Sequence, residues 1–258
     1  IMLLLTISTI SIMGSALSKS KHVFFIGAMA KRGVLQAYLA EHCPTDSFRI
    51  CAYRSEIVTN NNDFIWNDNS PLYKSGGWDA NKEDFNRIIK GSITEPRFIK
   101  MQIATSIIAT GQQLVQFHMG DGNIPFGPET GLQQDVQQYL PKDIPRMNAA
   151  AQQQARLLPI LEKLNIVYDV LIPISLLVFL VGCIFRWKKL SSALRFLLIL
   201  LGISVLLNAW DCATFSGTID RYGCKMIFLI PLMAVLVWGS AFRTKAITMA
   251  GRNDVGRK

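Results

Sequence analysis

The chain has 258 residues, half of them hydrophobic, and its mean hydropathy is +0.27. This high hydrophobic content argues against a wholly soluble protein and predicts membrane segments. The formal net charge is +9, but residues 17–163 hold 16 Lys/Arg against 14 Asp/Glu. The excess charge therefore lies beside the apolar segments, which is typical of topogenic signals and argues against a nucleic-acid partner.

Residues 1–17 form a short apolar segment without a basic start. Two interpretations are open. The sequence Gly14-Ser15-Ala16 has the small residues of a signal-peptide cleavage site. The missing basic flank and the start at Ile1 favour instead a partial transmembrane helix whose beginning is absent. Both interpretations place the following residues outside the cytoplasm.

Residues 18–163 are expected to form a mostly helical extracytoplasmic domain. The β-branched and aromatic run Val23–Ile26 predicts a short strand or an extended lead-in. Gly33–Glu41 is amphipathic and predicts a helix. Asp79 is expected to cap a helix over Ala80–Gly91, and Pro96 to begin the longest helix, which ends near Phe117.

Two more helices are expected before the membrane. One covers Gly131–Tyr139. The other begins near Pro145, passes through residues 149–155 and continues into the first membrane span, with a possible kink at Pro159.

The segment Phe64–Trp78 is aromatic and rich in turn residues, so we expect a loop. Its side chains Trp66, Tyr73 and Trp78 have two interpretations. They can anchor the loop on the domain core, or they can line a contact site for a carbohydrate or a lipid headgroup.

Residues 164–242 contain three apolar runs with almost no internal charge, at about 166–185, 194–210 and 226–242. A length of roughly 20 residues is enough to cross the hydrocarbon core of a bilayer. Trp187, Trp210 and Trp238 fall near the expected interfaces, as an aromatic belt requires. The sequence therefore predicts three transmembrane helices.

The basic residues predict the orientation of these helices. Four basic residues lie in or next to the loop between the first two spans, and five lie in the tail at 243–258 with one acid. The loop between the second and third spans holds two basic and two acidic residues. The positive-inside rule then places the tail in the cytoplasm and the domain of residues 18–163 on the other side of a plasma membrane.

Four of the five cysteines fall in segments expected outside the cytoplasm, where disulfides persist. The spacing favours two local bridges, Cys43–Cys51 and Cys212–Cys224, with reduced thiols as the alternative for each pair. The three histidines are not at metal-ligand spacing, and no phosphate loop or nucleophile motif is present, so neither a metal nor a cofactor is expected.

The external loop Thr218–Tyr222 places an acid, a base and a phenol at the mouth of the third span. Asp220, Arg221 and Tyr222 are therefore candidates for holding the phosphate of a lipid headgroup, with Arg221 as the donor. The alternative is a capped turn in which Tyr222 anchors the chain at the membrane interface.

The sequence Asp-Arg-Tyr followed by an apolar span with proline, Asp220–Pro231, looks like the late region of polytopic bacterial inner-membrane proteins, some of which are similar to GT-C type glycosyltransferases. The stretch from Leu35–Leu39 through Cys43-Pro44, Cys51–Arg54 and Trp66 to Gly76-Gly77-Trp78 resembles an uncharacterised bacterial membrane family with a periplasmic domain. The resemblance implies the C-terminal part of a larger polytopic protein.

These features lead to two functional expectations. The first is a part of an envelope-biogenesis membrane protein, with transfer of a lipid-linked sugar as its activity and a lipid-linked saccharide as its partner besides the bilayer. The second is a non-enzymatic, membrane-anchored scaffold or sensor whose external domain binds a ligand or a protein.

Overall fold

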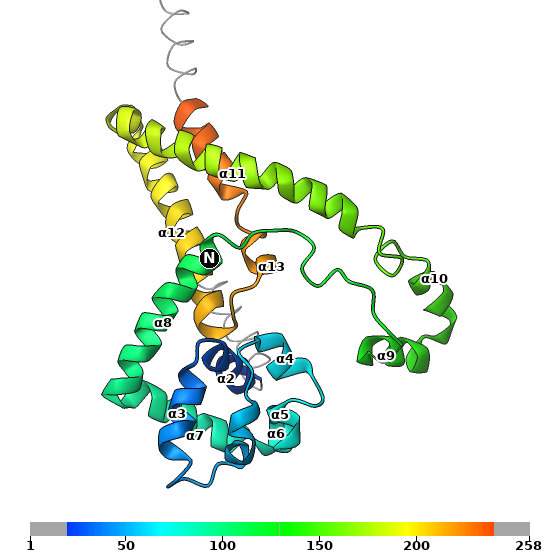
Figure 1. Cartoon of the computed structure of the whole chain (residues 1–258). Helices are drawn as coiled ribbons and strands as arrows, with labels where there is room; N and C mark the ends of the chain where they lie inside the picture. Colours follow the sequence, from blue (N-terminus) through cyan, green and yellow to red (C-terminus); the bar gives the residue numbers. More distant parts are fainter. Residues whose placement is uncertain (1–19, 129, 240–258) are drawn as a thin grey trace, which may run out of the picture. The chain divides into compact units, whose positions relative to one another are not determined.

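The structure is a computed structural model that describes residues 20–128 and 130–239; the expected segments 1–17 and 243–258 lie outside this range. The described part is mainly helical and contains no strand, in agreement with the helical part of the predicted fold class (Figure 1). The chain divides into two units. Of the described residues, the first unit comprises 20–113 and 209–218, and the second comprises 114–128, 130–208 and 219–239.

The first unit is built around helix α2 (Lys21–Lys31), which packs against α3, α4 and α7. Its helices after α2 are α3 (Val34–His42), the 3-10 helix η1 (Arg49–Glu56), α4 (Asn61–Trp66), α5 (Pro71–Lys74), α6 (Gly77–Ala80), α7 (Lys82–Thr94) and α8 (Pro96–Leu114). Their buried side chains form one hydrophobic core that includes Phe64, Phe85 and Phe98, all fully buried.

The expected strand at Val23–Ile26 is wrong, because these residues lie inside α2. Val23, Ile26 and Met29 are three residues apart and fully buried, so they share the core-facing side of a helix. The helical spacing of the buried residues along α2 therefore outweighs the strand preference of the four residues Val23–Ile26. Gly33, with φ of 75°, separates α2 from α3 in a backbone conformation that favours glycine.

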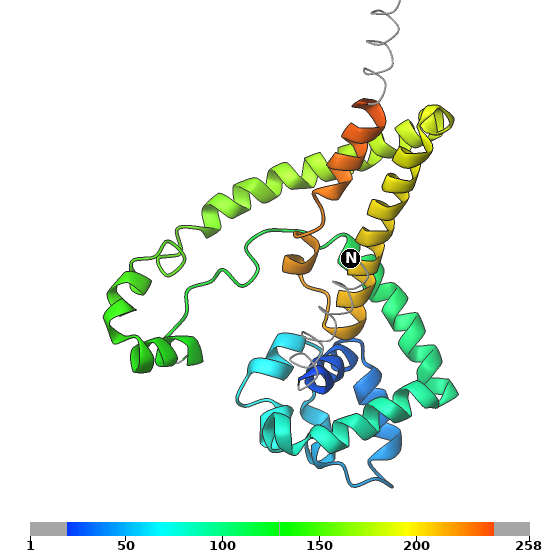
Figure 2. The same cartoon turned by 180° about the vertical axis from the view of Figure 1, so that it is seen from behind.

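The segment expected to be a loop, residues 64–78, is instead largely short helices, α4 to α6 (Figure 2). Pro71 begins α5, where its missing N–H costs nothing. Asp79 lies within α6 and does not cap α7, which begins at Lys82 after Asn81. The Asn81 amide spans this junction, donating to the Gly77 carbonyl (2.7 Å) and to the Ser75 hydroxyl (3.0 Å).

The second unit contains α9 (Gly131–Tyr139), η2 (Pro141–Asp143), α10 (Ile144–Asn148), α11 (Leu158–Arg186), η3 (Trp187–Lys189), α12 (Ser192–Phe215) as far as Asn208, and α13 (Asp220–Gly223). The prediction of one unbroken helix from Pro145 into the membrane is wrong. Turns over residues 149–156, with Ala155 at φ of 54°, separate α10 from α11. Pro159 lies in the first turn of α11 and so helps to begin that helix.

The first two expected spans lie within α11 and α12, both long and apolar enough to cross a membrane. Within the described residues the third span is represented by a shorter apolar helix, Leu229–Gly239. Part of this helix packs against α11, where the Trp238 indole donates to the Val178 carbonyl (3.1 Å). Gly182 allows this approach, since a Cβ there would lie 2.5 Å from the Val237 side chain.

Candidate functional site

The predicted lipid-headgroup triplet lies in the second unit, on the short helix α13. An Asp220 carboxylate oxygen accepts a hydrogen bond from the backbone N–H of His118 (3.0 Å). The Arg221 guanidinium lies 5.5 Å from the centre of the Tyr222 ring. These are the contacts of a capped turn, and the binding of a lipid phosphate by these three residues stays a prediction.

Next to this turn, a ring nitrogen of His118 lies 2.7 Å from a carboxylate oxygen of Asp169 on α11. Both side chains are about half exposed. The side chain of Asn165, also on α11, bonds both the N–H (2.7 Å) and the carbonyl (2.9 Å) of Met119. Together these contacts fasten the loop after α8 to the beginning of the first span.

The structure brings two of the three predicted aromatic contact residues together. Trp66 and Trp78 lie with their ring centres 5.5 Å apart, and both also contact Phe24 on α2. Trp66 is 55% exposed, whereas Tyr73 packs on the hydrophobic core. Tyr73 and Trp78 thus pack against the core and Trp66 is exposed, and the binding of a ligand by these three residues stays a prediction.

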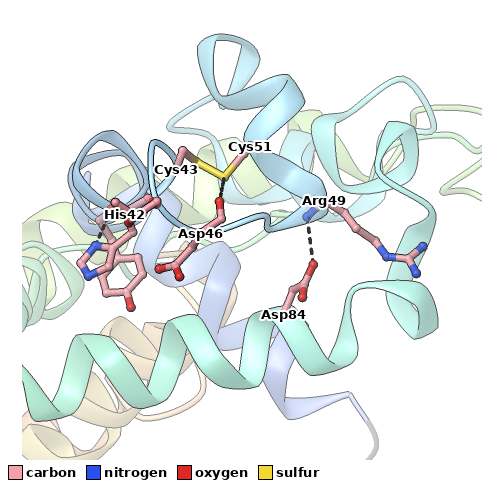
Figure 3. Close-up of a disulfide and its surroundings, with 8 residues drawn as sticks. His42, Cys43, Asp46, Arg49, Cys51 and Asp84 are labelled. Carbon is pink, nitrogen blue, oxygen red and sulfur yellow. Dashed lines mark hydrogen bonds between the residues drawn. A yellow bond between two sulfur atoms is a disulfide. The ribbon is translucent and has the colours of Figure 1, made fainter.

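The disulfide Cys43–Cys51 is present, with 5.6 Å between the Cα atoms (Figure 3). It joins the end of α3 to η1. Around it, the imidazole of His42 stacks on the Tyr38 ring at 4.0 Å and approaches Glu95 at 3.1 Å. The bridge thus closes a rigid corner of the first unit.

The second expected disulfide, Cys212–Cys224, would join residues of the two different units, and it stays a prediction. Cys212 lies inside α12, and the Cys224 thiol contacts the carbonyl of Arg221 (3.4 Å) at the end of α13.

A cavity of about 290 Å³ in the first unit is the site with the most distinctive chemistry, and sequence reasoning did not single it out. It lies between the end of α2, the middle of α8 and residues 213–218. Its lining includes two cations, Lys31 and Arg32, and otherwise only neutral residues: Ala28, Thr59, Thr105, Ile108, Ala109, Gln112, Ala213, Gly217 and Thr218.

The Arg32 guanidinium is held in place by neutral acceptors on three segments. Its Nε donates to the Ala28 carbonyl (3.1 Å) and one Nη to the Thr214 carbonyl (3.1 Å). The other Nη donates to the Ser106 hydroxyl and to the Gln102 carbonyl. Among the described residues no carboxylate forms an ion pair with Arg32.

Because Arg32 is buried without a partner carboxylate among the described residues, its pKa is lowered. Desolvation lowers the pKa of Arg32 to about 10, because leaving water penalises the charged form. Lys31 adds a second positive charge to the same cavity, and its ammonium donates to the Thr218 carbonyl (2.6 Å). Both cationic side chains therefore line the same cavity.

The only trace of this site in the sequence is the pair Lys31-Arg32 between an apolar helix and Gly33. Within residues 20–128 and 130–239, no group of three His, Cys, Asp or Glu could hold a metal ion.

Comparisons of the chain with protein families, with curated proteins and with solved structures find no match.

Proposed function

We propose that the chain is an integral membrane protein, anchored through α11, α12 and the helix that begins at Leu229, with a ligand-binding helical domain outside the cytoplasm. The observation that carries the proposal is the exposure of the two long apolar helices. Only 17% of the most apolar stretch of α11 and 11% of that of α12 is buried within the protein. The core helix of a soluble protein would be mostly covered by its neighbours.

The exposed side chains on these helices are large. Leu177 is 62% exposed and Ile184 is 76% exposed. Each fully buried side chain of this size is worth about 1.5–3 kcal/mol relative to water, so leaving many of them in water would be costly. A bilayer removes that cost, and patches of this extent are typical of membrane contact.

The side of the membrane is inferred from two independent features. The basic loop around Arg186–Lys189 is typical of the cytoplasmic side. The disulfide Cys43–Cys51 is compatible with an oxidising, extracytoplasmic environment. Both features favour a plasma membrane with the first unit outside the cytoplasm.

The binding role is inferred from the cavity beside Lys31 and Arg32. Of the two functions expected from the sequence, this cavity favours the membrane-anchored sensor or scaffold. Transfer of a lipid-linked sugar, as part of a larger polytopic envelope protein, remains the second candidate. One observation favours it: the close pair of His118 and Asp169 lies beside the predicted headgroup triplet, where a histidine can act as a general base.

Reporter fusions test the topology. A reporter that is active only outside the cytoplasm should be active when fused after Gly120 and inactive when fused after Lys189. The membrane fraction should retain the full chain after alkaline carbonate extraction, because the apolar helices lie within the bilayer. The opposite reporter pattern, or release of the chain by carbonate, would refute the proposal.

A further inference from the structure

We propose that a second pocket of the first unit binds one acyl chain of a zwitterionic phospholipid from the bilayer. This pocket has a volume of about 680 Å³ and lies between the beginning of α2, one face of α7 and the end of α12. The inference rests on the membrane anchoring proposed above. It does not depend on the cavity beside Lys31 and Arg32, because the two sites share no lining residue.

The walls of the pocket are mainly apolar. Three helices supply its large apolar side chains, which are Phe24, Phe25, Ile89, Ile93 and Phe215. The rings of Phe25 and Phe215 lie with their centres 5.6 Å apart and so join α2 to the end of α12. Part of the wall is uncovered, since Ile93 is 54% exposed and Phe215 is 51% exposed. A pocket of this size and composition favours an apolar ligand.

The position of the pocket along the chain favours a membrane lipid among apolar ligands. The second predicted span ends at Trp210, and the lining residues Asp211 and Phe215 follow it within the same helix, α12. Five residues of helix cover only about 7.5 Å, which is comparable to the depth of one headgroup layer. The α12 wall of the pocket therefore lies at the bilayer surface, where phospholipids surround it.

The charged residues of the lining favour a zwitterionic headgroup. Lys21 and Asp211 are both exposed and contribute one positive and one negative charge. Among the described residues, the lining contains no other carboxylate, ammonium or guanidinium group. A zwitterionic phospholipid carries one phosphate and one ammonium group, so each of these two side chains meets an opposite charge. An anionic phospholipid would leave Asp211 beside an unbalanced negative charge.

Contact of an exposed apolar surface with the bilayer explains only part of these features. Helix α8 also exposes an isoleucine, Ile103, which is 52% exposed and does not line the pocket. Surface contact would act on α7 and α8 alike, and it would leave the ends of the acyl chains in the bilayer centre. Uptake of an acyl chain into the pocket brings the end of that chain to α7 and not to the exposed face of α8.

A pair of variants separates the pocket from the rest of the surface. Ile93→Asp places a carboxylate in the apolar wall, where it opposes the entry of an acyl chain. Ile103→Asp is the matched control, because it makes the same change at a similarly exposed residue of the same unit outside the pocket. Circular dichroism of both variants establishes that they are folded.

The measurement is photo-crosslinking of the full chain in phosphatidylcholine nanodiscs. The probe is a small fraction of phosphatidylethanolamine with a diazirine near the end of one acyl chain, and mass spectrometry identifies the labelled peptides. We expect label in the α7 peptide of residues 86–93, besides label in α11 and α12, and little in the α8 peptide that contains Ile103. Ile93→Asp should reduce the α7 label at least about fivefold, since burial of a charge opposes binding, and Ile103→Asp should leave it unchanged.

The headgroup is tested with a phosphatidylglycerol probe that carries the same diazirine. We expect this anionic probe to label α7 at least about threefold less than the zwitterionic probe does, because its phosphate lacks a partner ammonium for Asp211. Equal α7 label by the two probes would overturn the proposed ligand class.

Three further results would overturn the proposal: no label in α7 while α11 is labelled, equal label in α7 and α8, or equal α7 label in Ile93→Asp and Ile103→Asp. The first result is expected if residues 1–17 of the chain or a second copy fill the pocket instead. In each case label in α11 shows that the membrane anchoring stands. Absence of label from α11 and α12 as well would refute the anchoring, and the lipid site with it.

Discussion

The two units use apolar residues in opposite ways. In the first unit, large side chains such as Phe64, Phe85 and Phe98 are fully buried in one core. In the second, Leu177 and Phe185 on α11 are 62% and 71% exposed, and the buried apolar cluster that includes Leu198 and Val237 is much smaller than the core of the first unit. The first unit therefore carries its own apolar interior, whereas the second depends on an apolar surrounding.

The largest effect expected from this contrast comes from truncating the core. Phe98→Ala should destabilise the first unit by about 3–5 kcal/mol, because it removes a buried ring and leaves a cavity. Hydrogen exchange followed by mass spectrometry on the chain in detergent should show faster exchange across α2, α7 and α8. Leu177→Ala, on the exposed face of α11, is the matched control and should leave these peptides unchanged. Equal responses to the two changes would contradict the contrast between the units.

The fold could be predicted from the sequence where the signal is local. The helix Gly131–Tyr139 has the expected bounds, and Pro96 begins α8 as predicted. The predicted secondary structure was wrong where the composition of a short segment indicated another element than the one it belongs to. Val23–Ile26 has the composition of a strand, yet it belongs to a helix whose burial pattern extends to Met29.

The cationic site could not be predicted for a related reason. The acceptors that hold the Arg32 guanidinium include the Gln102 carbonyl and the Thr214 carbonyl, which lie 70 and 182 residues away in the sequence. No local pattern joins such positions. The disulfide Cys43–Cys51, in contrast, joins cysteines only eight positions apart, so their spacing and their expected location outside the cytoplasm favoured this pair.

A smaller effect is expected from removing that disulfide. Replacing Cys43 and Cys51 together by alanine should destabilise the first unit by about 2.5 kcal/mol, the chain-entropy contribution for a short loop. The same hydrogen-exchange experiment should show faster exchange in α3 and η1. Cys183→Ala, within α11 of the second unit, is the control and should have no effect there. An unchanged exchange rate in the double variant would mean that the core alone holds this corner.

The smallest expected effect is a pH dependence confined to the first unit. Burial opposes ionisation of Asp84, but two hydrogen bonds outweigh it and lower the pKa of this carboxyl. The Arg49 N–H donates one of them (2.9 Å; Figure 3), and the Arg87 guanidinium donates the other (2.6 Å). The charged form is therefore favoured in the folded state. Its contribution to stability is present above the unfolded pKa of about 4 and is lost as the pH falls through the lower, folded pKa.

Asp84→Asn should consequently lower stability by about 1–2 kcal/mol at pH 7, since it removes the charge from two hydrogen bonds. The difference from the unchanged chain should shrink as the pH falls below about 4, because the native carboxyl is then becoming neutral as well. Asp79→Asn is the control, since Asp79 is an exposed residue of α6. Hydrogen exchange of η1 and α7, with rates corrected for intrinsic pH dependence, measures the difference. A difference that stays constant from pH 7 to pH 3 would show that the Asp84 charge does not stabilise the junction of η1 and α7.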